Sequence, residues 1–204
     1  MLKKTYLPVL MLCALLGSAS AAEPPPWRMI YDNDTTNILN CQSPFHNIDE
    51  RPRVLTDEKI RASVREAVVD GMDAQLIQPC TTWVPWWPSK IVPLKEHEQW
   101  FRDTYGVEPN IPEQRYLLNG GDIVGTFIDE CHKNNVAALV SLRINDAHHQ
   151  ERTWDENPPG IFAHCLNRFY REHPQYRLAP PPSRAIKDRV HNWAIPEARA
   201  HKEA

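Results

Sequence analysis

Glycine is scarce in this chain, at seven of 204 residues, whereas proline occurs nineteen times. This imbalance predicts long, stiff loops between the regular elements. Basic residues are too few to favour a nucleic-acid partner, because 23 Lys and Arg stand against 26 Asp and Glu, a formal net charge of −3. The cysteines show no CxxC spacing, which excludes a zinc ribbon as the organising element.

The sequence also lacks an apolar run long enough to span a bilayer, which needs roughly 20 residues. The apolar run Leu7–Leu16 is shorter, follows a basic start and precedes the small residues Ala19-Ser20-Ala21. This is the pattern of a secretory signal. We therefore expect a signal peptide over residues 1–21 and a mature domain over residues 22–204, secreted or periplasmic and without a membrane segment after cleavage.

Four cysteines remain after the expected cleavage: Cys41, Cys80, Cys131 and Cys165. An exported chain can form disulfides, and four cysteines allow three pairings that the sequence does not separate. Cys41 and Cys80 both follow ends of expected strands on the same side of the sheet, so they are the preferred pair.

Strand-like and helix-like segments alternate along the mature chain. Such alternation indicates an α/β fold of parallel strands joined by helical crossovers. Residues 81–88 are expected to be irregular because prolines interrupt them, and the apolar run that opens at Val136 indicates a strand buried on both faces. The expected strands are 27–31, 74–78 and 136–144, and the expected helices are 56–70, 93–105, 119–134, 159–172 and one starting at 195.

The last expected helix leads to no further strand. A complete (β/α)8 barrel takes about 250 residues, so residues 22–204, with long loops, cover about three of its eight units. We therefore expect parallel β/α units that form the first three of an incomplete (β/α)8 barrel. The alternative is a compact three-stranded α/β domain with long loops.

Polar and aromatic clusters follow all three expected strands. The carboxyl ends of parallel strands meet at the ligand side of such a fold, which predicts that these clusters form one rim. Carboxylates, amides and indole faces are the groups that bind sugars, and glycoside hydrolysis needs two carboxyls. None of these side chains is identifiable as the catalytic acid or nucleophile. The candidate substrate-binding residues are Asp32, Asp34, Gln78, Trp83, Trp86, Trp87, Arg143, Asn145, Asp146 and His148.

Each cluster also has a purely structural interpretation. The tryptophans could pack a long loop, Asp34 could cap a turn, and Arg143 could form an ion pair at a strand end. Asp146, His148 and His149 suggest a metal site, but adjacent histidines point apart on an extended chain and no third ligand follows at helical spacing. We therefore predict neither a metal nor another cofactor.

Three stretches resemble secreted bacterial glycoside hydrolase-like TIM-barrel proteins, often called family-10-like. They are Tyr31-Asp32-Asn33-Asp34, the segment Ser141–His148 and the segment Trp193–Lys202. The resemblance implies a barrel and a carbohydrate substrate. It also implies that the last segment leads into an acid-bearing strand, an Asp-Gly-(hydrophobic)-Glu-Leu-Asp-Phe type of motif, which this sequence does not contain. On this reading the chain is an N-terminal fragment of a secreted glycoside hydrolase-like protein and is inactive alone. The alternative is a non-catalytic extracellular carbohydrate-binding α/β module.

Overall fold

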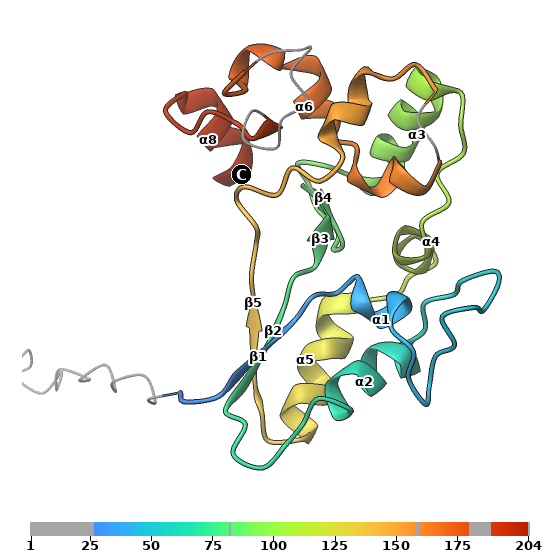
Figure 1. The fold of residues 1–204 in the computed structure, drawn as a ribbon, viewed down its shortest axis with the longest axis vertical. Helices are drawn as coiled ribbons and strands as arrows, with labels where there is room; N and C mark the ends of the chain where they lie inside the picture. Colours follow the sequence, from blue (N-terminus) through green and yellow to red (C-terminus); the bar gives the residue numbers. More distant parts are fainter. Residues whose placement is uncertain (1–26, 82, 158–159, 180–188, 204) are drawn as a thin grey trace, which may run out of the picture.

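The computed structural model describes residues 27–81, 83–157, 160–179 and 189–203, so the expected signal peptide lies outside the described residues. Three strands, β1 (Ile30–Asn33), β2 (Ala74–Ile77) and β5 (Ala137–Val140), form a parallel sheet in the order β1-β2-β5 (Figure 1). This confirms the predicted α/β class with parallel strands. The first strand is shifted from the expected 27–31, since β1 begins at Ile30 and extends to Asn33, and the third is shorter than the expected 136–144, since β5 ends at Val140.

Helices α2 (Asp57–Arg65) and α5 (Ile123–Lys133) lie side by side on one face of this sheet (Figure 1). The Thr56 side chain accepts the Lys59 N–H at the start of α2, as its sequence position predicted. The start of α5 differs from the prediction, because Asp122 caps it in place of Asn119. The core beneath the two helices includes Ile60, Val64, Ile77, Ile123 and Phe127, all fully buried.

The opposite face of the sheet has no covering layer in the described part of the chain. On this face Ile30 is 48% exposed, and Leu76 and Leu139 are only half-buried. The expectation that the third strand is buried on both faces is therefore wrong, because no residue of β5 is fully buried and Val140 is 51% exposed.

The segment after β2 contains more regular structure than predicted. Strands β3 (Cys80–Thr81) and β4 (Val84–Pro85) pair antiparallel, which corrects the expectation of an irregular stretch. Proline is tolerated there because Pro85 lies on a two-stranded edge. Helix α3 (Leu94–Tyr105) forms as predicted, while the short helices α1 (Asn37–Asn40) and α4 (Pro112–Leu118) were not predicted.

The carboxyl-terminal part builds a second cluster beside α3. The predicted helix over 159–172 is divided, because a 3₁₀ helix (Gly160–Cys165) precedes α6 (Arg168–Glu172), which Asn167 caps; Pro159 itself lies outside the described residues. Helix α8 (Pro196–Glu203) begins at the proline, as expected. Two further 3₁₀ helices span Gln150–Trp154 and Pro174–Tyr176.

None of the helices within the described ranges has the length and apolar character needed to cross a membrane. Cys41 is an exposed free thiol, so the predicted Cys41–Cys80 disulfide is absent from this part of the chain. Cys80 is instead buried in β3.

Candidate functional site

The carboxyl ends of the strands come together through hydrogen bonds between β1 and the residue that follows β2. Gln78 Nε2 donates to both carboxylate oxygens of Asp32, at 2.9 Å each. The Gln78 carbonyl in turn accepts the Thr35 hydroxyl at 2.7 Å. Two of the predicted rim residues are thus in direct contact, and Gln78 is 7% exposed whereas Asp32 is open to solvent.

Asp34 connects the first strand to the third. Its Oδ2 lies 3.0 Å from an Arg143 guanidinium nitrogen, and its Oδ1 accepts the Thr36 hydroxyl at 2.9 Å and the Thr36 N–H at 3.2 Å. Burial alone would raise the pKa of Asp34, but the bonds from Thr36 and Arg143 outweigh it and lower that pKa below its ordinary 3.8. Asp34 is therefore an ionised carboxylate at neutral pH.

Alternation along β1 explains which of these groups reach the rim. Asp32 pairs in register with Leu76, on the uncovered face, whereas Asn33 pairs with Ile77, on the face that the helices cover. Asn33 lies between Asp32 and Asp34 in the sequence, but its side chain lies on the opposite face of the sheet from that of Asp32.

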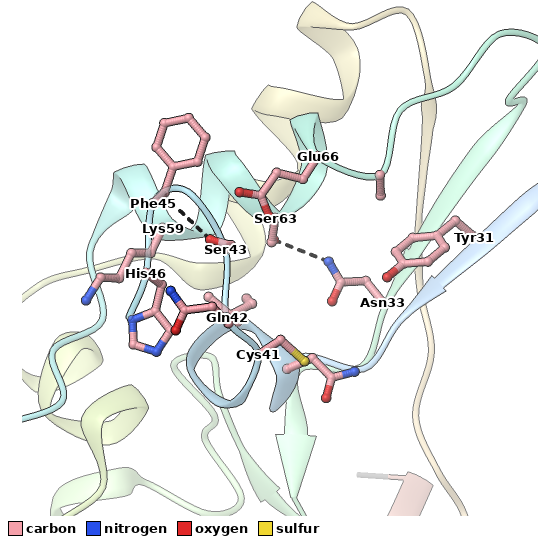
Figure 2. A pocket seen from close by; sticks show the side chains of 13 residues that line it. Tyr31, Asn33, Cys41, Gln42, Ser43, Phe45, His46, Lys59, Ser63 and Glu66 are labelled. Carbon is pink, nitrogen blue, oxygen red and sulfur yellow. Dashed lines mark hydrogen bonds between the residues drawn. The ribbon is translucent and has the colours of Figure 1, made fainter. Parts of the chain in front are cut away.

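Asn33 instead lines a different cavity, of about 320 Å³, on the helix side of β1. Figure 2 shows its amide pointing to the Ser63 hydroxyl of α2, a bond of 3.2 Å, with Tyr31 and Cys41 nearby. Because it lies on the helix side, this cavity is separate from the rim at the strand ends.

The third predicted cluster surrounds a cavity of about 500 Å³, which Arg143, Asn145, Asp146 and His148 line together. The Asp146 side chain is 2% exposed and contacts the ring Nδ1 of His148, whose own side chain is 64% exposed. A buried carboxylate that holds one imidazole nitrogen orients the ring and leaves its other nitrogen available to a ligand. Asn145 accepts the indole N–H of Trp193.

His149 does not join this cluster. It adopts a left-handed conformation at φ 57°, and its ring packs 4.3 Å from the ring of Phe162, while the two histidine rings lie 6.4 Å apart. Burial is the main cause that lowers the pKa of His149. Across the described ranges, no group of three or more His, Cys, Asp or Glu side chains is arranged to hold a metal ion.

Two of the three tryptophans expected to stack on a sugar are buried. Trp86 is 1% exposed and belongs to the core under α2 and α5. Trp83 is 8% exposed and its ring stacks on His191 at 4.2 Å. Of the three candidate tryptophans, only Trp87 is half-buried and retains an accessible surface. The packing interpretation is therefore the one that the structure supports for Trp83 and Trp86.

Sequence reasoning missed two sets of residues. Arg189 lines the rim cavity and lies 2.6 Å from Glu151, but its position depends on a fold that no local pattern announces. The second set is a group of arginines around a further cavity, described below. The closely spaced Arg51 and Arg53 were the one feature of the sequence that could have indicated it. No protein-family model matches this chain, and no curated protein matches it.

Proposed function

We propose that this chain is the leading part of a (β/α)8 barrel of the glycoside hydrolase-like type, and that its rim binds a carbohydrate. The observation that carries the proposal is the strand order β1-β2-β5 with both crossover helices, α2 and α5, on one face. Doubly wound sheets reverse their strand order and carry helices on both faces. Barrel units follow chain order and leave the other face to the barrel interior.

The uncovered sheet face supports the same proposal. Ile30, Leu76 and Leu139 are apolar side chains that a barrel interior would bury, and β1 and β5 each leave one edge unpaired in the described sheet. A compact three-stranded domain gains nothing from this arrangement, since exposed apolar faces and free edges favour association.

The rim chemistry supports a saccharide ligand. Asp32, Asp34 and Gln78 lie at one end of the sheet, and Arg143 links them to the cavity that His148 faces. These groups accept and donate hydrogen bonds, as sugar hydroxyls require. The resemblance of the three sequence stretches to glycoside hydrolase-like proteins points to the same ligand class.

We expect binding without hydrolysis. Hydrolysis needs one carboxyl that stays protonated to act on the leaving group, with a second one about 5–9.5 Å away. Asp34 is held ionised by Arg143 and Thr36, and Asp146 is occupied in orienting His148. In the proposed barrel, the catalytic acids come from a further strand.

The test is calorimetric titration of the purified chain with neutral and acidic oligosaccharides, together with a reducing-sugar assay. Binding that falls about tenfold in Asp34→Asn and Arg143→Gln, but not in the exposed control Asp129→Asn, supports the proposal. The absence of any saccharide binding contradicts the carbohydrate rim. Turnover of a glycan that Asp146→Asn abolishes would overturn the expectation of an inactive chain.

A further inference from the structure

A second large cavity, of about 530 Å³, lies beside the rim between α1, the loop that follows it and the start of α4. Its apolar lining includes Leu39, Trp86 and Ile111, all nearly fully buried. Its polar lining is dominated by guanidinium groups. The polar residues used below are Asn40, Arg51, Arg53, Asn110, Glu113 and Arg115.

The loop arginines have neutral partners. Arg51 donates to the main-chain carbonyls of Ile48 and Glu50, at 3.0 and 2.6 Å. Arg53 donates to the Asn40 side chain at 2.5 Å and to the carbonyl of Ile48 at 3.4 Å. Each guanidinium has five N–H donors, so several of them stay available on each side chain.

The third arginine completes the pattern. Arg115 donates to the Asn110 side chain and, at 3.1 Å, to the Arg53 carbonyl. In the described ranges, no carboxylate oxygen lies within 4.0 Å of any of the three guanidiniums. The one carboxylate of the cavity, Glu113, is 8% exposed; burial raises its pKa, and the charges of Arg53 and Arg115 only partly oppose this shift.

The three arginines form a local group of positive charge, although the formal net charge of the whole chain is −3. Planar guanidiniums with free donors bind carboxylates and sulfates through paired, charge-assisted hydrogen bonds. An apolar base with such groups around it suits a small ring that carries one anionic group.

The cavity adjoins the proposed substrate rim through a single residue. Thr36 lines the cavity, and its hydroxyl and N–H both bind the Asp34 carboxylate. The rim and this cavity therefore share Thr36 as a common wall.

We propose that the cavity between α1, the 51–53 loop and α4 is a subsite for the acidic group of an anionic saccharide, such as a uronic acid. Its identity as a saccharide subsite rests on the proposed function; the anion site itself does not. The three guanidiniums indicate an anionic ligand. Thr36, which the cavity and the rim share, indicates that this ligand is part of a saccharide.

The experiment titrates the chain with glucuronate, glucose and inorganic sulfate, in wild type and in the variants Arg53→Gln, Asp34→Asn and Arg102→Gln. Arg102→Gln is the matched control, because it removes one positive charge from α3, and Arg102 already has two acidic partners, Glu98 at 3.6 Å and Glu108 at 3.4 Å. Thermal unfolding of each variant shows that the fold is kept, and Arg53→Lys supplies a second variant that retains the charge.

We expect glucuronate to bind at least about tenfold more tightly than glucose, and its affinity to fall about tenfold in Arg53→Gln but not in Arg102→Gln. The affinity should also fall with added salt, since exposed charges are screened over about 8 Å at physiological ionic strength. Sulfate binding with no preference for glucuronate would reduce the cavity to a general anion site and overturn the saccharide assignment. Equal glucuronate binding by wild type and Arg53→Gln would overturn the site itself. We expect Asp34→Asn to bind glucuronate as tightly as wild type, because Asp34 belongs to the rim. The Arg53 and Asp34 variants therefore test the anion site and the rim separately.

Discussion

Asp34 and Arg143 lie 3.0 Å apart at the end of the sheet although 109 residues separate them in the chain. One residue follows β1 and the other follows β5, so their ion pair spans the strand between them. It is the contact that joins the first and third polar clusters into one rim.

Arg143→Gln is expected to raise the pKa of Asp34, because it removes one of the groups that lower it. Both side chains are 36% exposed, so solvent screens the pair and the loss of stability should stay below about 1 kcal/mol. NMR titration of the Asp34 carboxyl measures the pKa, and urea unfolding measures the stability.

The sign of the pH effect follows from the lowered pKa. The contribution of the Asp34–Arg143 pair to the free energy of unfolding is complete above pH 3.8, the ordinary pKa of Asp34. It is lost as the pH falls through the lower pKa of the folded state. Arg143→Gln should therefore reduce the acid sensitivity of the fold. An unchanged Asp34 titration in this variant would show that Thr36 alone lowers the pKa.

Trp86→Ala is expected to destabilise the chain by about 3–5 kcal/mol, because Trp86 is 1% exposed and fills the core under α2 and α5. Trp87→Ala is the matched control and should cost under about 1 kcal/mol, since Trp87 is only half-buried. Urea unfolding compares the two. If both variants lost equally little stability, Trp86 would not be a core residue, and the sugar-stacking interpretation would be supported instead.

Glu130 ties α5 to α2 by accepting hydrogen bonds from Arg61 and Arg65, at 3.1 and 3.0 Å, with its side chain 7% exposed. Burial alone would raise the pKa of Glu130, but these bonds outweigh it and lower that pKa below its ordinary 4.5. Glu130→Gln should cost about 1–3 kcal/mol at pH 7, and less as the pH falls through the lowered pKa. The exposed neighbour Asp129→Asn is the control, and a similar cost for both would contradict a specific bridge.

His97 on α3 is 5% exposed, and burial lowers its pKa from the ordinary 6.5 to about 4. Between these two values the unfolded chain binds a proton that the folded chain does not, so stability falls as the pH drops from 6.5 to about 4. The accumulated penalty is about 3 kcal/mol at the acid end of this window.

His97→Gln should remove this part of the acid dependence, which urea unfolding at pH 7 and pH 5 measures. His132→Gln on α5 is the control, because His132 is exposed. If both variants kept the wild-type slope, the acid sensitivity of the fold would have to arise elsewhere.

The helices with clear periodicity and caps could be predicted from the sequence. Thr56 caps α2 as expected, although α2 ends at Arg65 and not near residue 70. Helix α3 lies within one residue of its predicted bounds, and α8 begins at Pro196. The short elements could not be predicted, because β3, β4 and α4 have too few residues for a period to be visible. Tertiary contacts stabilise them.

Local sequence patterns were enough to predict the alternation of strands and helices, and with it a parallel sheet whose strand ends carry Asp32, Asp34, Gln78 and Arg143. These are local properties, set by side-chain spacing and backbone preference. Which side chains meet depends on how the folded chain packs. This packing buries Trp86 in the core and gathers three arginines around one cavity. Burial and contact depend on segments far apart in the chain, and no local pattern encodes them.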